Sequence, residues 1–555
     1  MSGTSWRSLL PGRDDVAALP RTWRGDLLAG LSVGVVALPL ALAFGVSSGA
    51  GAEAGIVTAI VAGIVAAVFG GSHIQVSGPT GAMVVVLAPV LAAHGVSALA
   101  IVTLMAGVLV VVAGLARLGR LVGLIPWPVI EGFTVGIAII IFLQQVPAAV
   151  GFAAGESGVK AWRAAVDAVL AADWSVAWHS LAVVVAVIVL MRVWPRVTTA
   201  VPGAIVAIVL ATVGVVVVGS TIPTIGVLPA GLPAPAIPAL GLETVRALAG
   251  PAVAIAALAA IESLLSARVA HSYTDVGGYD ADRELVGQGL ASLASGLFGG
   301  MPATGAIART AVNVRAGART RLAAVTHALV LLAVVVAASG LVARIPLAAL
   351  SGVLMATAVS MVRPSVVRSV VKASRPDALL FLMTALITVS VDLIYAIVIG
   401  MAVAALLALR AVSRAAGVHR EELPGDPVPG DERIALLRID GALFFGTADR
   451  VLERVARVHG VRVVILRMSQ IRVLDATGAQ VLGEVVAALE RRNVTVLIKG
   501  AQRHHLGLLE HAGTLAALAD DRHLVDRLDE AVSRARALVA DDVAQPDGAP
   551  GSVGA

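Results

Sequence analysis

The sequence contains no cysteine among its 555 residues, few aromatic residues (3%) and few charged residues (14%). The absence of cysteine excludes disulfide bonds, thiolate nucleophiles and cysteine-based metal sites. The low charge excludes an ordinary soluble domain of this length, because such domains carry about a quarter charged residues. Hydrophobic residues make up 58% of the chain. They occur in repeated runs of about 20 nearly uncharged residues, which predict membrane-spanning helices.

Small residues take the place of the missing aromatic side chains, and the chain has 57 glycines. Small residues let membrane helices approach one another closely, so the composition predicts tightly packed helix bundles. The formal net charge is +5 at pH 7. The basic residues lie in short loops between hydrophobic runs, where they orient a membrane protein. Nucleic acid is therefore not an expected partner.

One polar stretch inside the hydrophobic region, Pro302–Thr320, is too short and too polar to cross a bilayer. It begins Pro-Ala-Thr-Gly, which suits the first turn of a helix, because proline is tolerated there and threonine can cap free amides. Arg309 follows in the same stretch. A helix that begins at mid-membrane presents free N–H groups and the positive end of its dipole to a ligand. We therefore expect an anion to bind at this half-helix.

A second half-helix is predicted upstream, beginning near Pro79. Thr-Gly-Ala occurs at Thr80 and again at Thr304, 224 positions apart, and Ile-Pro occurs at Pro126 and Pro346, 220 positions apart. Two motifs that recur at nearly the same spacing indicate an internal duplication. Paired hydrophobic segments that glycine and proline interrupt in matching halves indicate a transporter binding site.

The hydrophobic runs predict an α-helical polytopic membrane protein with 14 transmembrane elements. Seven elements form a first repeat at residues 25–220, a Pro/Gly-rich connector follows at residues 221–245, and seven form a second repeat at residues 246–412. The third element of each repeat is a broken half-helix. An odd number of elements per repeat inverts the second repeat relative to the first. The predicted full spans are residues 26–48, 53–71, 97–116, 125–151, 180–193, 201–218, 247–271, 284–299, 323–342, 346–362, 378–391 and 393–412.

The N-terminal segment, residues 1–24, is polar and lacks the apolar core of a signal peptide. With this segment in the cytosol, the even-numbered loops are cytosolic, and these loops are rich in basic residues. This excess of basic residues in the even-numbered loops predicts a multi-pass protein of the cell membrane with both termini in the cytosol. The more polar residues 155–178 are expected to lie on the membrane surface. The basic residues of the cytosolic loops are Arg117, Arg120, Arg192, Arg196, Arg268, Arg283, Arg315, Arg319, Arg321, Arg363, Arg368, Lys372 and Arg375.

Beyond residue 412 the pattern becomes that of a soluble domain. Residues 413–432, rich in proline and acidic residues, form a predicted linker. Strand-like and helical runs then alternate through residues 433–540, which predicts a small cytosolic α/β domain. Residues 541–555 are predicted to be disordered. The expected strands are residues 434–439, 461–468 and 494–498, and the expected helices are residues 448–458, 479–492, 503–512 and 523–538.

This organisation resembles the SulP family of anion transporters over nearly the whole chain. The most specific motifs are QVSGPTG at Gln75–Gly81 and TGAIART at Thr304–Thr310. The C-terminal domain is similar to a STAS domain, with the Asp-x-Thr-Gly turn of that domain at Asp475–Gly478. The resemblance implies a transporter without a cofactor, surrounded by membrane lipid, that forms a homodimer with STAS contacts.

In the SulP family the substrate lies between the N-termini of the two half-helices. This chain lacks the glutamine that many members carry after the proline of the first span, so Phe44 is expected to line the site. Arg309 matches a basic position near the anion; alternatively it extends to headgroups at the membrane surface. The implied substrate-binding residues are Phe44, Ser77, Thr80, Gly81, Ala303, Thr304, Gly305, Ala306 and Arg309.

The eighth element of the family supplies an acidic group that faces the site, which implies Glu262 here. Ser266 lies four residues on and so on the same helical face. An ionisable group at mid-membrane is a functional candidate, although a carboxyl that is hydrogen-bonded in a packed interior is an alternative. Bicarbonate-carrying sodium symporters of the family bind the ion with an acid and a hydroxyl four residues apart. This resemblance implies bound Na⁺ at Glu262 and Ser266, with Thr304 nearby, while a glutamate also suits proton coupling.

Thr477 matches the position that is phosphorylated in anti-sigma-antagonist relatives of the STAS domain. A hydroxyl at a helix N-terminus is well placed to carry an anion. Asp475 and Thr477 also suit an ordinary helix start, because threonine is a common N-cap. Thr477 is therefore a candidate regulatory site, with helix capping as the alternative.

The leading hypothesis is a secondary transporter of a small inorganic oxyanion, sulfate or bicarbonate, driven by H⁺ or Na⁺ symport or by anion exchange. A dicarboxylate transporter of the same family is an alternative. A nucleobase transporter of the same architecture would lack the STAS-like domain, and a passive anion channel would not need Glu262. An enzyme is not expected, because the spans contain no His/Asp/Glu cluster and no nucleophile–base pair.

Overall fold

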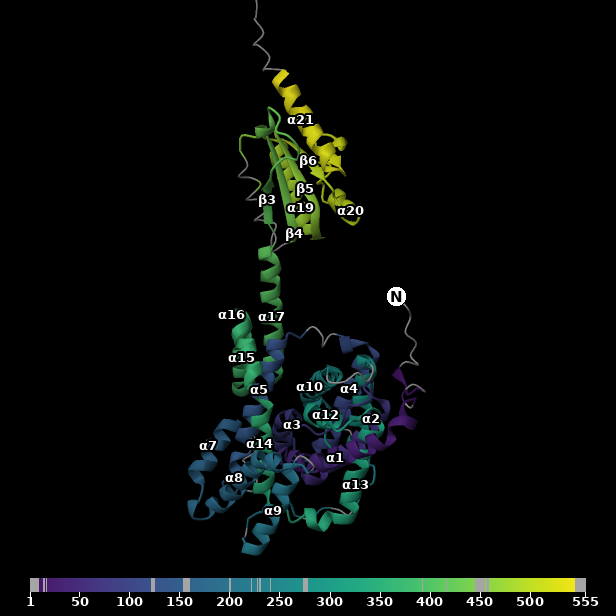
Figure 1. Ribbon diagram of the computed structural model, residues 1–555, viewed down its shortest axis with the longest axis vertical. Helices are drawn as coiled ribbons and strands as arrows, with labels where there is room; N and C mark the ends of the chain where they lie inside the picture. The colour runs from purple at the N-terminus through teal and green to yellow at the C-terminus, as the bar shows by residue number, and fades with distance from the viewer. Residues whose placement is uncertain are drawn as a thin grey trace, which may run out of the picture. The chain divides into compact units, whose positions relative to one another are not determined.

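The computed structural model describes residues 9–12, 15, 17–120, 125–152, 160–198, 201–220, 222–226, 228, 231–239, 241–272, 278–391, 393–415, 417–444, 455 and 459–544. The chain divides into two compact units, Met1–Met401 and Ala402–Ala555. The first unit is a helical bundle, and the second contains a five-stranded sheet covered by helices (Figure 1).

The first half of the helical unit follows the predicted order of elements. The helix over residues 161–171 falls in the stretch predicted to lie on a membrane surface, and it is short. Pro39 lies inside the first helix without breaking it, as membrane helices tolerate when neighbouring groups satisfy the freed carbonyl. The elements are α1 (Leu19–Ser47), α2 (Ala52–Phe69), β1 (Ser77–Gly78), α3 (Gly81–His94), α4 (Ala98–Leu115), α5 (Trp127–Gln144), α6 (Val146–Ala149), α7 (Ala161–Ala171), α8 (Trp174–Val197) and α9 (Gly203–Val218).

The second half repeats this order, with one helix that the sequence analysis did not predict. That helix, α15, begins with Pro364 in its first turn, where proline costs no hydrogen bond. It occupies the basic loop after the fifth element. The elements are α10 (Leu242–Ser272), α11 (Ala281–Leu297), β2 (Thr304–Gly305), α12 (Ile307–Arg315), α13 (Leu322–Val342), α14 (Leu347–Met361), α15 (Pro364–Ala373), α16 (Arg375–Ser390) and α17 (Leu393–Ala415).

Nine helices within the described residues are long and apolar enough to cross a membrane. The shorter helices α9, α11 and α16 and the half-helices α3 and α12 complete the set of predicted elements. The prediction of a polytopic helical membrane domain is confirmed, whereas the inverted relation of its halves stays a prediction.

The half-helix at α12 begins later than predicted. Pro302 does not open the helix; the backbone stays extended until Ala306, and the first helical residue is Ile307. The extended residues Thr304 and Gly305 pair with β1, which satisfies backbone groups that a helix would otherwise satisfy. Thr304 does not act as the predicted cap of α12, which has no side-chain cap hydrogen bond, and α3 has none either.

Small residues bring the helices close together, as the composition predicts. Where α1 crosses α2, a β-carbon added to Gly45 would lie 2.9 Å from the amide nitrogen of Gly55. A similar contact joins α11 to the end of α2 at Gly287 and Gly70. Larger side chains at these positions would separate the helices.

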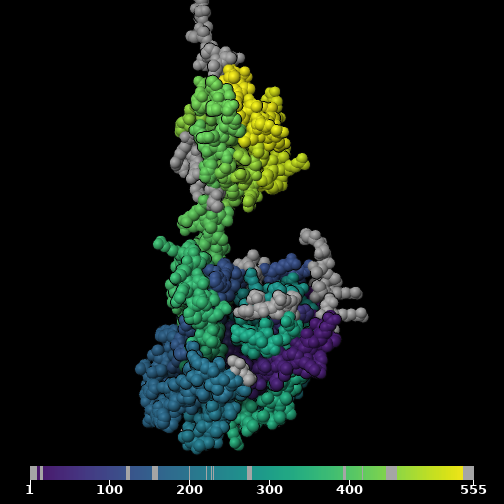
Figure 2. All heavy atoms as spheres, in the orientation of Figure 1, coloured from purple at the N-terminus to yellow at the C-terminus, as the bar shows by residue number. Residues whose placement is uncertain are grey.

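Two groups of helices pack within this unit. A core bundle contains α1–α4 and α10–α13, and an outer bundle contains α5–α9, α14 and α16. In Figure 2 the blue spheres of α7, α8 and α9 gather on one side of the unit, apart from the purple spheres of α1. Apolar side chains such as Val185, Val213 and Leu386 are exposed on the outer bundle. The half-helices α3 and α12 contact α1 and α10 inside the core bundle (Figure 1).

The C-terminal unit has a sheet with the order β3-β4-β5-β6-β7, in which only β3 and β4 are antiparallel. One face packs on α19, and the opposite face packs on α21 (Figure 1). The predicted helix at residues 448–458 lies outside the described residues except for Val455. The elements are β3 (Gly417–Glu421), β4 (Ile434–Leu443), β5 (Val463–Leu474), α19 (Ala476–Glu490), β6 (Thr495–Lys499), α20 (Arg503–His511), β7 (Leu524–Val525) and α21 (Leu528–Ala544).

The boundaries of this unit differ from the sequence pattern at both ends. The strand β3 falls inside the predicted linker, residues 413–432, and pairs with β4 along its length. The last helix, α21, extends to Ala544 and so into the predicted tail, of which residues 545–555 lie outside the described part. β3 is short and its hydrophobic residues do not alternate, so the sequence alone does not indicate a strand. The strand forms because it pairs with β4.

We expect a chain that ends after Ala415 to keep the substrate preference of the full chain while its turnover changes. The cut leaves α17 complete and removes the whole sheet, whereas a cut at Arg420 would divide β3. The measurement is counterflow of several labelled anions in proteoliposomes, compared with the full chain. A changed order of preference among the anions would show that the C-terminal unit contributes to selectivity.

Candidate functional site

The two half-helices meet at a short antiparallel ladder between β1 and β2. Ser77 pairs with Gly305 and Gly78 pairs with Thr304. The amide of Ala306 also donates to the carbonyl of Val76 at 2.9 Å. The two extended segments therefore meet in the core bundle, and we call the paired residues Ser77–Gly78 and Thr304–Gly305 the crossing. The half-helices α3 and α12 begin just after it.

The first-turn amides of both half-helices have no capping side chain. Thr80 and Ala306 occupy the N-cap positions of α3 and α12, and neither side chain accepts a hydrogen bond from its helix. Uncapped amides at a helix N-terminus carry a partial positive charge and bind anions. The crossing thus places two such helix ends in one small region.

Arg309 reaches from α12 to the opposite half of the crossing. Its side chain is 1% exposed, and Nη2 donates to the carbonyl of Pro79. Nη1 is buried and has no hydrogen-bond partner among the described residues. A β-carbon added to Gly78 would lie 2.7 Å from Nη1, so the glycine leaves room for the guanidinium. The alternative that Arg309 extends to a membrane surface does not hold, because its guanidinium lies inside the core bundle.

Glu262 of α10 accepts a hydrogen bond from the hydroxyl of Thr80 at 2.8 Å. The contact joins the second repeat to the N-cap residue of α3. Glu262 and Arg309 are close enough to interact electrostatically. The candidate site therefore holds one carboxylate, one guanidinium and the free amides of two helix ends.

Ser266, the predicted hydroxyl partner of Glu262, is buried and its hydroxyl lies 3.4 Å from that of Thr310. The neighbouring Ser263, which the sequence analysis missed, bonds β2 instead. Its hydroxyl accepts from the amide of Gly305 at 3.1 Å and shares a hydrogen bond of 3.0 Å with Thr304. A serine next to Glu262 in an apolar helix was the available sequence signal.

Three further predicted residues are held by neighbours on α11 or by packing. The hydroxyl of Ser77 accepts from Gln288 at 2.5 Å, and the amide of Ala303 donates to Ser292 at 3.1 Å. Ala303 also packs among small residues of α2 and α11. Ala306 is 6% exposed and bonds Val76 through its backbone.

Phe44 and Gly81 meet where the outer bundle covers the crossing. A β-carbon added to Gly81 would lie 3.4 Å from the Phe44 ring and would overlap the side chain of Ile141 on α5. Phe44 is 7% exposed, and Thr80 and Thr304 are 5% and 0% exposed. These three residues are therefore buried, whereas Ile307, the first helical residue of α12, is 39% exposed.

We expect Gly305→Ala to lower the initial rate of uptake about tenfold, as overpacking of a tight contact does. The added methyl group would overlap the amide of Gln75, which donates to the carbonyl of Ser263 at 3.2 Å. The measurement is initial uptake in proteoliposomes at matched protein content. Gly214→Ala on α9 is the control, because nothing lies within 4 Å of its added carbon. A normal rate in Gly305→Ala would remove β2 from the site.

The sequence analysis places a cation at Glu262 and Ser266, so the oxygen atoms around Glu262 are of interest. The described residues contain no group of three or more His, Asp or Glu side chains that could hold a metal ion. The carboxylate of Glu262 and the hydroxyl of Thr80 are oxygen groups of the kind that hard cations prefer, whereas the carbonyl of Pro79 accepts from the guanidinium of Arg309. The hydroxyl of Ser266 faces α12 instead.

Thr477 lies in the first turn of α19, where its side chain is exposed. Asp475 is the N-cap and accepts from the amide of Gly478 at 2.7 Å. Thr477 is therefore not the capping residue, and its hydroxyl is accessible at a helix N-terminus. Gly478 itself passes close to the carbonyl of Leu443, which leaves no room for a side chain.

Comparison with known proteins follows the same division of the chain. The Sulfate permease family matches residues 23–384, and the STAS domain matches residues 427–531. YvdB of Bacillus subtilis (strain 168), provisionally named a sulfate transporter, is 35% identical over 518 residues, covering 91% of this chain and 96% of that protein. The bicarbonate transporter BicA of Synechocystis sp. is 32% identical over 503 residues, covering 87% and 89% of the two chains.

A solved structure shows the same fold across the chain. The murine anion transporter Slc26a9 in its inward-facing state has a TM-score of 0.84 and covers 97% of this chain and 96% of that chain, at 16% identity. The matches to named transporters confirm the prediction of a transporter rather than an enzyme. The chain therefore belongs to the sulfate permease (SulP) family of membrane anion transporters and carries a STAS domain after its membrane region.

Proposed function

We propose that the protein is a secondary active transporter of a small inorganic oxyanion, bicarbonate or sulfate. The observation that carries the proposal is the buried Nη1 of Arg309, which has no partner among the described residues and lies at the crossing of two uncapped half-helices. A buried guanidinium N–H without a partner is costly, and an anion at the crossing would satisfy it. The likeness to YvdB and BicA supports the two substrates.

In this proposal the anion lies between the N-termini of α3 and α12. Arg309 supplies the charge, and the first-turn amides at Gly81 and Ile307 supply further donors. Ser77, Ala303, Thr304, Gly305 and Ala306 hold the crossing in register. Phe44 and Ile141 form an apolar cover, so the anion enters when the core bundle moves against the outer bundle.

Glu262 provides a physical reason for coupling. An ionised Glu262 beside the crossing repels an anion that binds there, and H⁺ or Na⁺ at this carboxylate removes the repulsion. Each ion then binds more tightly in the presence of the other. The proposal thus includes symport with H⁺ or Na⁺, with exchange of anions as the alternative when the cation stays bound.

The proposed setting is the cytoplasmic membrane, with both termini in the cytosol. The basic loops support this orientation, and the exposed apolar side chains of the outer bundle would face lipid. A homodimer with STAS contacts and phosphorylation at Thr477 are part of the same proposal. The exposed hydroxyl of Thr477 supports the second of these.

The test is counterflow in proteoliposomes that contain the purified protein. Radiolabelled sulfate, bicarbonate, a dicarboxylate and a nucleobase are each exchanged against an internal pool of the same unlabelled compound. We expect saturable exchange of bicarbonate or sulfate and none of the nucleobase. Exchange of the dicarboxylate or the nucleobase alone would contradict the proposal, and unsaturable flux would indicate a channel.

A further inference from the structure

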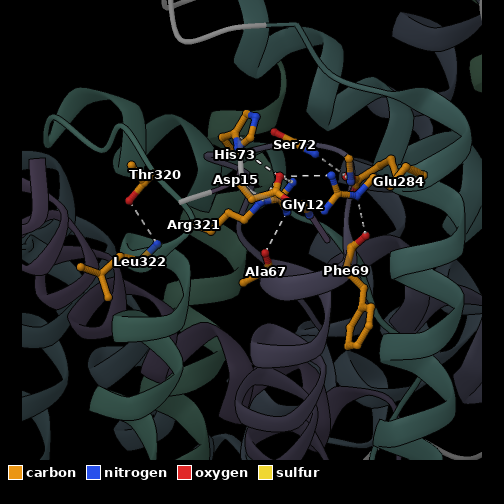
Figure 3. A network of polar contacts seen from close by, with 12 residues as sticks. Gly12, Asp15, Ala67, Phe69, Ser72, His73, Glu284, Thr320, Arg321 and Leu322 are labelled. Carbon is orange, nitrogen blue, oxygen red and sulfur yellow. Dashed lines mark hydrogen bonds and ion pairs between the residues drawn. The ribbon is translucent and has the colours of Figure 1, made fainter. Parts of the chain in front are cut away.

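A pair of arginines meets a single carboxylate near the C-terminal end of α2. Arg283 donates to both oxygens of Asp15 at 3.1 and 2.7 Å. Arg321 donates to Oδ1 of Asp15 from Nε and Nη2, at 3.1 and 2.8 Å. Figure 3 shows Asp15 between Arg321 and His73, whose Nδ1 lies 3.8 Å from the same carboxylate.

Both guanidinium groups are held in place independently of Asp15. Nε of Arg283 donates to the carbonyl of Phe69 at 3.3 Å, and Nη1 of Arg321 donates to the carbonyl of Ala67 at 2.9 Å. Ala67 and Phe69 belong to the last turn of α2, whose carbonyls have no partner within the helix. Figure 3 shows both carbonyls beside the cluster. The two forks are therefore fixed with their remaining N–H groups directed at one point.

The cluster needs an anion at that point. The side chains of Arg283, Arg321 and Asp15 are 11%, 9% and 7% exposed. The nearby Glu284 is already engaged, because its oxygens accept from the amides of Gly71 and Ser72 and from Gln288. Without Asp15, two little-exposed cations would face each other across an empty centre, which is unfavourable.

The charge state of Asp15 agrees with this arrangement. Burial raises the pKa of its carboxyl, but the hydrogen bonds from Arg283 and from the amide of Gly12, together with the charges of Arg321 and Arg283, lower the pKa to about 2 overall. The carboxylate is therefore ionised at neutral pH. Arg283 binds both carboxylate oxygens in the bidentate geometry that favours arginine, and Arg321 adds two further N–H donors to Oδ1.

We propose that Arg283 and Arg321 form a second oxyanion-binding site, which the chain fills with its own Asp15 in this structure. A small free oxyanion, such as formate or bicarbonate, fits between the same two guanidinium groups. Such an anion competes with Asp15 for the site. The inference rests on the arginine pair alone and does not depend on the proposed function at Arg309.

The experiment is chemical rescue of Asp15→Ala in the full chain, purified in detergent without added lipid. In chloride, we expect the thermal midpoint to fall by about 3 °C or more, because a little-exposed ion pair is broken. Replacing chloride by about 50 mM formate at equal ionic strength should restore at least about half of that loss. The wild-type chain, whose site is occupied, should respond by less than about 1 °C.

Two double variants separate this site from the one at the crossing. Asp15→Ala with Arg321→Gln should lose the response to formate, and Asp15→Ala with Arg309→Gln should keep it. A fall in the midpoint that formate does not reverse would show that Asp15 is only an anchor and would overturn the proposal. Rescue that survives Arg321→Gln, or that disappears with Arg309→Gln, would overturn it as well.

Asp15→Ser provides the same comparison if Asp15→Ala yields no folded protein. The serine side chain is shorter than the carboxylate, so it removes the charge and leaves the centre between the two guanidinium groups open. A lowered midpoint that formate leaves unchanged in Asp15→Ser counts against the site in the same way. Dioleoylphosphatidylglycerol added in place of formate tests a lipid phosphate, and stabilisation by this lipid but not by formate overturns the free-anion ligand.

Discussion

Transport by Arg309→Gln is expected to fall about 100-fold in kcat/KM, mostly through a higher apparent KM. Glutamine cannot supply the charge that Nη1 of Arg309 offers at the crossing. One charge-assisted hydrogen bond in a buried site contributes about 1.5–3 kcal/mol, which corresponds to this loss. The measurement is the concentration dependence of counterflow in proteoliposomes.

The conservative replacement and a matched control make this result interpretable. Arg309→Lys keeps the charge but lacks the planar fork with which the guanidinium addresses the carbonyl of Pro79 and the anion, so we expect a loss of only about tenfold. Arg315→Gln lies on the same half-helix with an exposed side chain and should transport normally. If both replacements at residue 309 reduced transport equally and only slightly, the charge of Arg309 would not contribute to anion binding.

Glu262→Gln is expected to abolish accumulation of the anion against its gradient while leaving exchange in place. The amide keeps the size of the side chain and still accepts from Thr80, so the N-cap of α3 is preserved. It cannot take up H⁺ or hold Na⁺ as a carboxylate does, so the coupling described above is lost. Accumulation should fall at least about tenfold.

Concentrative uptake under an imposed H⁺ or Na⁺ gradient measures this effect. Glu243→Gln on the same helix is the control, because its side chain is exposed and lies in the first turn of α10. Whichever gradient drives the wild type identifies the coupling ion. Undiminished accumulation in Glu262→Gln would leave Glu262 with a structural role alone.

The membrane elements could be predicted from the sequence because each is a local signal. Long apolar runs define the helices, and the glycine and proline landmarks at Thr80 and Thr304 mark the two half-helices. The exact start of α12 could not be predicted in this way. The residues just before it, Thr304 and Gly305, pair with β1, more than 220 positions away, and that pairing overrides the local preference of Pro302 for a first helical turn.

The site was predicted in part for the same reason. Arg309 and Glu262 stand out because charge is rare in apolar helices. Ser263 does not stand out, and Gln75 does so only as part of a family motif, yet Ser263 bonds both Gln75, just before β1, and Gly305 of β2. The cluster at Asp15 joins residues separated by more than 260 positions, and no periodicity or motif connects them.

The ladder between β1 and β2 has a consequence for exchanging parts between relatives. Because Ser77 and Gly305 share one ladder, neither half-helix can be transplanted without its partner. A chimera that receives residues 74–94 from a relative must also receive residues 301–315, or the donor strand meets a foreign register. Substrate preference should therefore transfer between relatives only when both segments are exchanged together. Chimeras that receive only one of the two segments should be inactive.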